Sequence, residues 1–292
     1  MSAGAERSRG RAGLARQLVR RLRSAPMVAV GVVIILAVAL AAVFAPLLSH
    51  FDPNTISFGE KLRAPGAGHW LGTDELGRDI WTRVVFGARI SLSIAIVVVA
   101  LAMTAGLLIG ALAGFAGGWL DTVIMRTVDV LIAIPGLVLA MALTAALGPS
   151  LEHAMIALAF VALPSYIRLV RGQALVARHA GYTEAAESFG AGGAYIIRVH
   201  IIPDCLPVAL VQGSLDVGRM ILAAAALSFL GLGAQPPSPE WGAMVATGRQ
   251  YLMTHWWYPT APGIAILITA VGFNLVGDGV RDWLDPTAET RR

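Results

Sequence analysis

Acidic side chains inside apolar sequence are the first candidates for chemistry. Asp216 and Asp278 both lie in long apolar segments, and two neighbouring aspartates in a membrane are what an intramembrane aspartyl protease requires. Asp278 stands between two glycines at the predicted end of a helix, which argues against a catalytic pair. The sequence has no HExxH, no GxSxG and no GxxxxGK[ST] phosphate loop. We therefore expect no catalytic residue, metal or cofactor on this chain, and any ATP that it uses must bind to another chain.

Asp216 also has a basic neighbour. Arg219 follows it by three residues, so on a helix the two side chains share a face and can bond to each other. An isolated charge at the centre of a bilayer costs at least about 2.5–3.5 kcal/mol, so such groups usually face a bundle interior or a water-filled path. We expect both residues to be buried in the bundle. The sequence leaves open whether they form a structural pair or line a translocation pathway.

The stretch from Tyr182 to Gly190 is typical of a short polar helix. Thr183 is placed to cap its amino end, and Glu184 suits the positive end of the helix dipole. An apolar stripe and a glycine stop follow, made of Ala185, Ala186 and Phe189 and then Gly190, Gly192 and Gly193. Two helical turns are marginal alone, so we expect this helix either to dock against a partner or to lie on lipid.

Two further groups of residues precede apolar segments. Asp74, Arg78 and Asp79 lie among turn-forming glycines, and we interpret them as an ion-paired turn, with direct solute contact as the alternative. An aromatic cluster comes later in the chain: Trp241, Tyr251, Trp256, Trp257 and Tyr258. It is typical of an aromatic belt at the membrane surface, and the alternative is a loop that faces a partner or a pathway entrance.

Composition indicates what kind of molecule positions these residues. Hydrophobic residues make up 57% and charged residues 14% of the 292 residues, and the mean hydropathy is +0.71. Soluble domains are about 45–50% apolar and about 25% charged. A soluble enzyme, a disordered chain and a fibrous repeat are excluded. The single cysteine, Cys205, excludes a disulfide framework and is interpreted as a small buried residue.

The apolar residues fall into six runs that approach or exceed the roughly 20 residues of a membrane-spanning helix. The predicted spans cover about 25–48, 90–120, 130–147, 151–169, 206–233 and 259–277. We expect the second to end in a turn near Gly117, the third to tolerate Pro135 inside its helix, and the fourth to end at Arg168 and Arg171. The fold class is therefore all-α, a polytopic membrane protein with six transmembrane helices.

Glycines recur every four residues in the second span. Gly106, Gly110, Gly114 and Gly118 place small residues on one helix face, where another helix can approach closely. The alternative is a generic glycine-rich membrane helix.

Basic residues set the expected orientation. Residues 1–24 carry seven arginines and one acid, a charge of +6, so the rest of the chain sums to −2. With the amino terminus inside, fifteen Lys and Arg residues fall inside and six outside, which predicts cytoplasmic termini. The basic tail is interpreted as a membrane anchor; a signal peptide or a nucleic-acid-binding arm fits less well.

Several motifs together resemble one family. Glu184-Ala185-Ala186, then Gly190 and Ile202-Pro203, is similar to the EAA loop of ATP-binding-cassette importer permeases. That pattern reads EAA, three residues, Gly, nine residues, Ile, one residue, Leu-Pro; the spacing is intact here, but His200 and Ile202 replace its Ile and Leu. Other segments resemble the C-type permease of the dipeptide/oligopeptide/nickel importers: 71–79, 87–92, 227–233, 235–237, 239–242 and 278–286. The likeness covers nearly the whole chain apart from the basic tail.

The resemblance implies a type I importer permease in the cytoplasmic (inner) membrane of a prokaryote. The chain would pair with a second, related permease and receive solute from an extracytoplasmic binding protein. Two ATPase subunits, which hold ATP and Mg, would dock on a coupling helix near 183–190 made by Glu184, Ala185, Ala186, Phe189 and Gly190. The expected cargo is a dipeptide or oligopeptide, with nickel or glutathione as alternatives. A secondary transporter or channel without an ATPase is disfavoured by the EAA spacing.

The predicted organisation has four parts. Residues 1–24 form the basic cytoplasmic tail, and 25–88 form the first transmembrane helix and an extracytoplasmic segment. Residues 89–280 form a core of five helices, and 281–292 form a cytoplasmic tail.

Overall fold

The computed structural model describes residues 26–284, with only the backbone at 282–284. The predicted basic tail 1–24 and residues 285–292 lie outside the described part. Within 26–284 the chain is helical with connecting loops, and its extended pairing is one isolated bridge between Thr73 and Asp79.

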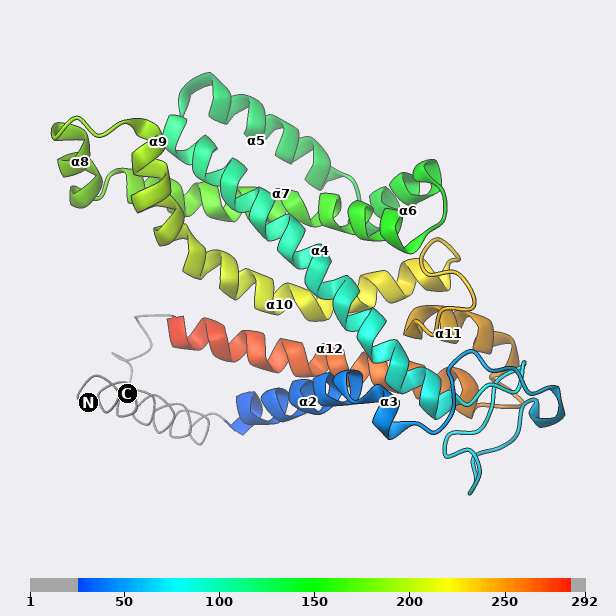
Figure 1. The fold of residues 1–292 in the computed structure, drawn as a ribbon. Helices are drawn as coiled ribbons and strands as arrows, with labels where there is room; N and C mark the ends of the chain where they lie inside the picture. Colours follow the sequence, from blue (N-terminus) through cyan, green and yellow to red (C-terminus); the bar gives the residue numbers. More distant parts are fainter. Residues whose placement is uncertain (1–25, 285–292) are drawn as a thin grey trace, which may run out of the picture.

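Long helices run back and forth along one bundle (Figure 1). The crossing elements are α2 (Pro26–Val43), α4 (Ile80–Ala116), α5 (Gly118–Ala133) with α6 (Gly136–Leu147), α7 (Leu151–Arg178), α9 (Gly193–Ile196) continuing through a π turn into α10 (Ile202–Phe229), and α12 (Trp257–Leu284). Five of the described crossings are single helices long and apolar enough to span a membrane, and α5 with α6 forms a bent pair that makes the sixth. The predicted all-α fold with six spans is confirmed.

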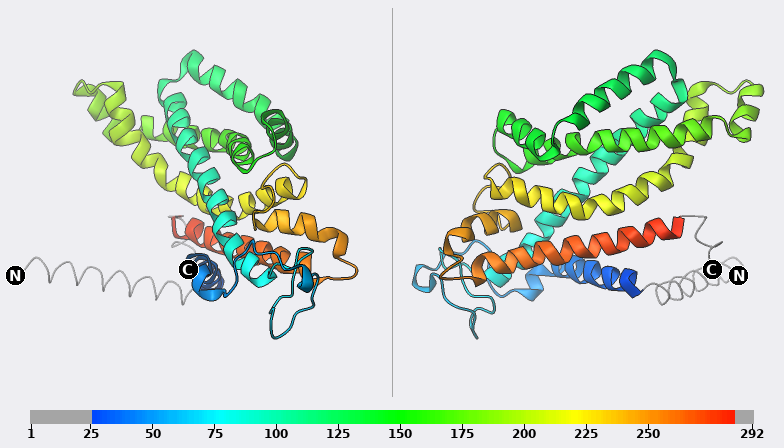
Figure 2. Two further views of the ribbon diagram at one scale, coloured as in Figure 1. Left: turned by 45° about the vertical axis from the view of Figure 1, so that its right-hand side comes forward. Right: turned by 180° about the vertical axis from the view of Figure 1, so that it is seen from behind.

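The two ends of the bundle differ in structure. α2 begins and α12 ends at the end that carries α8 (Gly181–Ser188), here called the α8 end (Figures 1 and 2). The opposite end, the α11 end, carries α3 (Ala45–Leu48), the loop 49–79 and α11 (Trp241–Gly248). An even number of crossings returns the chain to the end where it started.

The third crossing differs from the prediction. It starts at Gly118, not near residue 130, and the helix breaks at Pro135, where α6 turns away by 94°. Proline lacks the N–H that a continuing helix needs and clashes with the preceding turn, which favours a break. Two acidic residues of α5 interrupt its apolar run, so the sequence did not predict this part of the span. In the structure both acids form ion pairs with arginines of α7: Asp121 with Arg171 at 2.5 Å, and Asp129 with Arg168 at 2.7 Å.

Three other helices are longer than their apolar runs. α4 starts at Ile80, and α7 continues past both predicted interface arginines to Arg178. The fifth crossing starts at Gly193, not near residue 206. Charged residues inside these extensions ended the apolar runs, but helix hydrogen bonding continues through them because it depends on backbone groups, not on side-chain polarity.

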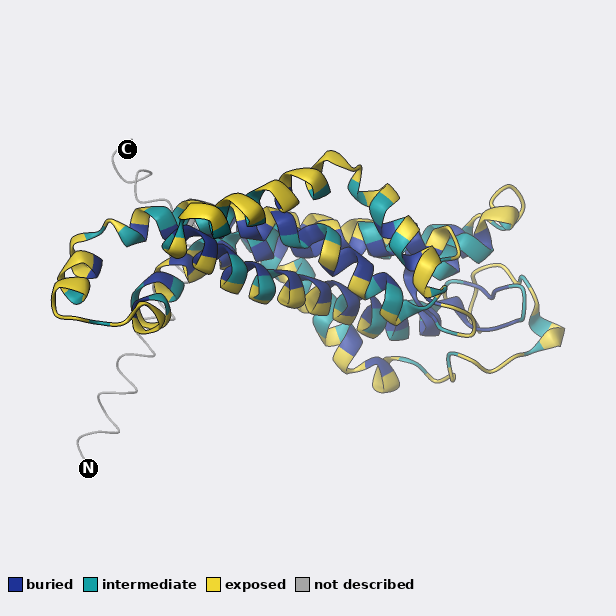
Figure 3. Cartoon of the chain, turned by 90° about the horizontal axis from the view of Figure 1, so that it is seen from above, coloured by how far each residue is buried: buried dark blue, intermediate teal, exposed yellow. Residues whose placement is uncertain are grey.

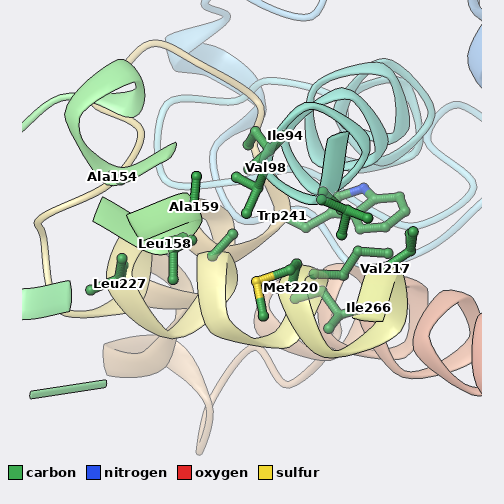
Figure 4. Packing of buried hydrophobic residues seen from close by; sticks show 14 of the residues in the cluster. Ile94, Val98, Ala154, Leu158, Ala159, Val217, Met220, Leu227, Trp241 and Ile266 are labelled. Atoms are coloured by element: carbon green, nitrogen blue, oxygen red, sulfur yellow. The ribbon is translucent and has the colours of Figure 1, made fainter. Parts of the chain in front are cut away.

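The main core forms where α4, α7, α10, α11 and α12 meet (Figure 4). Trp241 is the largest fully buried side chain there, and the same core contains Val98 of α4, Leu158 of α7, Met220 of α10 and Ile266 of α12. α4, α7 and the first part of the fifth crossing also build a second, smaller core toward the α8 end.

The glycine stripe of α4 is the contact with α7. A Cβ on Gly106 would lie 2.3 Å from Tyr166 Cβ, and one on Gly110 would lie 2.7 Å from the carbonyl oxygen of Ile167. Gly114 meets Ala174 in the same way, so the close-packing interpretation is confirmed for these three glycines. Gly118 is not part of the contact, because it begins α5 with φ +60° and open space around it.

Replacing Gly110 by alanine should therefore destabilise the protein. The new methyl group has no room against α7, and overpacking of this kind costs about 1–3 kcal/mol. Gly172→Ala is the matched control, because a Cβ at Gly172 would meet nothing within 4 Å. We expect a lower melting temperature in detergent for Gly110→Ala alone. Equal melting temperatures for the two variants would contradict close α4–α7 packing.

Candidate functional site

α8 projects from the end of the bundle (Figures 1 and 3). Glu184 and Ala185 are exposed on it, and Phe189, just past its last residue, is 91% exposed. Ala186 is half-buried against the second core. The predicted apolar stripe is thus divided: Ala186 packs against the second core of this chain, whereas the Phe189 side chain is exposed to solvent.

Thr183 fastens α8 to α7. Its side chain is fully buried, and Oγ1 donates a hydrogen bond of 2.7 Å to the carbonyl oxygen of Ala177. The prediction that Thr183 caps α8 is wrong, because the helix begins at Gly181 with Ala180 at the cap position. Thr183 therefore lies inside the first turn, where its hydroxyl faces the end of α7.

Gly190 makes the turn that ends α8. Its φ is +81°, a left-handed conformation that favours glycine. Gly190 N–H donates to Glu187 O at 2.9 Å and Ala191 N–H donates to Ala186 O at 3.0 Å, the pair of bonds of a Schellman motif. The predicted end of the helix at Gly190 is confirmed.

His200 connects α8 to the fifth crossing, and sequence reasoning missed it. Its ring lies 5.7 Å from that of Tyr182 in α8 and 6.2 Å from that of Tyr195 in α9. The available signal was its departure from the EAA pattern, where it stands in place of Ile. α8 is therefore held by α7 on one side and by the start of the fifth crossing on the other, so a force on α8 reaches two crossing helices.

The charge pair of α10 is only half buried. Asp216 is 2% exposed, and its Oδ1 accepts hydrogen bonds from Arg219 and, at 2.9 Å, from Gln212 Nε2. The side chain of Arg219 is 57% exposed, so the prediction that both residues are buried is wrong for Arg219. Positions three apart on a helix differ by about 60° in direction, enough for Asp216 to face the core near Tyr166 while Arg219 faces outward.

At the α11 end, Asp74, Arg78 and Asp79 form a buried, ion-paired turn. Arg78 Nε donates to Asp74 Oδ2 at 2.6 Å, and Asp79 caps α4 by accepting from Thr82 N–H at 2.7 Å. His69 Nδ1 lies 2.9 Å from Asp79 Oδ1. Asp74, Arg78 and Asp79 are each at most 6% exposed, so their polar atoms serve the fold and are not open to a solute.

Arg83 joins this turn to distant parts of the chain. Its Nη1 donates to Pro53 O at 2.8 Å and to Pro237 O at 3.4 Å, and its Nε lies 3.6 Å from Asp74 Oδ2. Sequence reasoning counted Arg83 only as a basic residue. Its position in the first turn of a membrane-spanning helix was the available signal.

Two aromatic residues are wrongly assigned by the belt interpretation. Trp241 and Tyr258 are 1% exposed; Trp241 Nε1 donates to Val84 O at 2.8 Å, and the Tyr258 hydroxyl donates to Glu75. Trp256 is 61% exposed and fits the prediction. Large aromatic rings near a helix end are equally suited to filling the junction between α4, α11 and α12.

Two acids outside the crossings are perturbed by their surroundings. The hydrogen bond with His69 lowers the pKa of Glu60, whereas burial raises the pKa of Glu240. Glu240 caps α11 by accepting from Gly242 N–H at 2.9 Å and Ala243 N–H at 2.8 Å. Neither acid has the arrangement of a catalytic group, and the described residues contain no cluster that could hold a metal.

Comparison with known proteins agrees with this architecture. Residues 106–290 match the family described as "Binding-protein-dependent transport system inner membrane component", and residues 13–65 match "N-terminal TM domain of oligopeptide transport permease C". The chain belongs to this family of binding-protein-dependent transport system membrane components. It is a multi-pass permease, a transport subunit and not an enzyme.

Similar proteins carry names of the same class. The chain is 53% identical over 272 residues to the "Probable D,D-dipeptide transport system permease protein DdpC" of Escherichia coli, covering 93% of this chain and 91% of that protein. It is 43% identical to the "Dipeptide transport system permease protein DppC" of Alkalihalophilus pseudofirmus, over 93% of this chain and 89% of the relative. It is 42% identical to the "Glutathione transport system permease protein GsiD" of Pectobacterium atrosepticum, over 91% and 89%.

Proposed function

We propose that this chain is one of two related permease subunits in an ATP-driven importer of peptides. The observation that carries the proposal is α8, a short helix that projects from the bundle while anchored to two crossing helices. The family description supports a binding-protein-dependent transporter. The dipeptide names of the relatives support a peptide cargo.

α8 is the coupling helix in this proposal. Two ATPase subunits, which hold ATP and Mg, serve the complex, and one of them docks on the exposed face of α8. Glu184 presents an anion to a basic groove, and Phe189 inserts as an apolar anchor. Closure of the ATPases then moves α7 and the fifth crossing through Thr183 and His200.

The α8 end faces the cytoplasm in this proposal, together with both termini. The excess of fifteen basic residues over six supports this orientation. The solute-binding protein then delivers its cargo to the α11 end. The cargo is a dipeptide or a longer peptide, and the relative named for glutathione transport keeps glutathione as the second candidate.

The test of the function is uptake by the complete complex. The chain is reconstituted in proteoliposomes with its second permease, ATPases and binding protein, and uptake of a labelled dipeptide is followed with and without ATP. We expect ATP-dependent uptake that unlabelled dipeptide inhibits better than glutathione or Ni²⁺. Uptake without ATP, or preferential inhibition by Ni²⁺ or glutathione, would contradict the proposal.

Orientation is tested by cysteine labelling in a Cys205→Ala background. Lys61 in the loop 49–79 and Ser188 in α8 are both exposed and are each replaced by cysteine. A membrane-impermeant maleimide should label position 61 in intact cells, and position 188 only after permeabilisation. The reverse pattern would overturn the orientation and the role of α8 with it.

A further inference from the structure

A small cavity lies at the α11 end of the bundle, between the end of α3 and the start of α4. Its volume is about 170 Å³, and Leu48, Phe51, Trp70, Asp79 and Trp81 are among the residues that line it. Pockets for whole drug-sized ligands measure about 300–1,000 Å³. This cavity therefore suits a small group, or one end of a larger molecule.

The cavity lies at the level where the bilayer meets water. α2 begins at Pro26 and its 18 residues rise about 27 Å, close to the hydrocarbon thickness of about 30 Å. α3 follows and ends at Leu48, on the wall of the cavity. Leu40, Phe44 and Leu47 lead up to it and are exposed, as expected of side chains that contact lipid tails. A lipid that covers this apolar surface has its headgroup beside the cavity.

Three aromatic rings contribute to the wall. The ring centroids of Trp70 and Trp81 lie 5.5 Å apart with 52° between their planes, so the two indoles are in contact. Trp81 Nε1 donates to Leu48 O at 3.1 Å, which fixes this ring against the end of α3. Phe51 is stacked on His69 at 5.1 Å. The face of an aromatic ring carries partial negative charge and attracts cations, and indole does so most strongly.

A carboxylate adds negative charge to this wall. Asp79 lines the cavity; its Oδ2 accepts from Thr82 N–H at 2.7 Å, and its Oδ1 lies 2.9 Å from His69 Nδ1. These contacts hold the carboxylate at the start of α4. The described residues that line the cavity include no lysine and no arginine. Aromatic faces and a carboxylate together favour a cation over an anion.

We propose that this cavity binds the primary ammonium headgroup of a phospholipid of the phosphatidylethanolamine type, from the membrane leaflet at the α11 end. The ammonium group lies against the rings of Trp70 and Trp81, with Asp79 as its counter-charge. The acyl chains follow the exposed apolar side chains of α2 and α3. The bound lipid ties the loop 49–79, which carries Trp70, to the membrane surface, whatever solute the protein transports.

The test measures how fast a cysteine in the cavity reacts when the surrounding lipid changes. Gly68 lines the cavity, and a Cβ there would meet nothing within 4 Å, so Gly68→Cys should fold normally. The variant is made in the Cys205→Ala background, and the purified complex of permeases and ATPases is reconstituted in nanodiscs. Methyl methanethiosulfonate is the reagent, because it is uncharged and the surface charge of the membrane does not concentrate it.

Two lipids are compared, phosphatidylethanolamine and its N-acetyl derivative, which has the same chains but no cation. Gly68→Cys should react about tenfold more slowly in the first, since a bound ammonium group shields the thiol. Gly66→Cys is the matched control: Gly66 is exposed and does not line the cavity, and the nearest atom to its Cβ would be Ala64 O at 3.9 Å. It should react at one rate in both lipids.

Further arms identify the wall and the source of the ligand. Trp70→Ala should remove the difference between the two lipids at Gly68→Cys, because part of the aromatic wall is lost. Trp256→Ala is its control, an exposed tryptophan at the same end that does not line the cavity. Glycerophosphoethanolamine, the soluble headgroup without acyl chains, should not slow the reaction at about 1 mM, because a bilayer presents its lipids at a far higher local concentration.

Several results would overturn the proposal. Equal rates in the two lipids would leave Trp70 and Trp81 as ordinary interfacial tryptophans, and slowing by the soluble headgroup would indicate a site for a free solute. Slowing that requires the solute-binding protein would make the cavity part of a protein docking surface. A Gly68→Cys that reacts in neither lipid would mean that the assembled complex closes the cavity. None of these measurements involves uptake, so their outcome is independent of the proposed function.

Discussion

Peptide uptake by the assembled importer should fall to background when Glu184 is replaced by lysine. Glu184 is exposed on α8 and faces away from the contacts that hold the helix, so the change leaves the fold of the chain intact. In the proposed complex the new lysine lies against a basic groove of the ATPase. Loss of a buried charge contact of this kind weakens binding by about 2–5 kcal/mol. The measurements are ATPase copurification and ATP-dependent uptake, with membrane insertion followed by yield.

The control for this experiment reverses the same charge at the opposite end of the bundle. Glu152 is exposed in the first turn of α7, so Glu152→Lys should cost only about 1 kcal/mol, as expected for a charge near a helix terminus. Phe189→Asp should reproduce the Glu184→Lys defect, because Phe189 is the exposed apolar group beside it. Wild-type uptake in Glu184→Lys would remove the assignment of α8 as the coupling helix.

The second large effect is expected at the α11 end. Asp74→Asn removes the carboxylate that holds Arg78 at 2.6 Å and approaches Arg83 at 3.6 Å, and all three side chains are buried. Breaking a buried ion pair by neutralising one partner costs about 3–5 kcal/mol, since the remaining charge stays buried. We expect a large drop in melting temperature in detergent and faster proteolysis in the loop 49–79.

Asp52 provides the matched control. It is exposed in the same loop and accepts one local hydrogen bond of 2.8 Å from Asn54 N–H. Asp52→Asn should change stability by about 1 kcal/mol or less. An Asp74→Asn protein as stable as the wild type would mean that Glu75, which lies 3.1 Å from Arg78, is sufficient to hold the cluster.

The arrangement of α8 carries a mechanical consequence. The Thr183–Ala177 hydrogen bond and the tilted ring contact between His200 and Tyr182 attach a two-turn helix to the ends of two long ones. Long helices transmit a displacement at one end along their length, because backbone hydrogen bonds keep them stiff.

The sequence alone determined the all-α class, the six crossings, the short helix that ends at Gly190, and the α4 glycine face. Each depends on a local property: apolar length, helical spacing, or a backbone conformation that only glycine adopts easily. The same property explains why the predicted start of the third span was wrong. Acids in α5 interrupt its apolar run, and their neutralisation by Arg168 and Arg171 of α7 is not visible locally.

Only the tertiary structure decided what individual side chains do. Thr183 is a tether and not a cap, Trp241 is a core residue and not part of a belt, and Arg219 is exposed beside a buried Asp216. Arg83 joins residues more than 150 positions apart in the chain, at Pro237 and Ser238. Spacing along a helix sets the direction of a side chain, but its partner is set by which helices pack against that face, and those contacts connect residues that are distant in sequence.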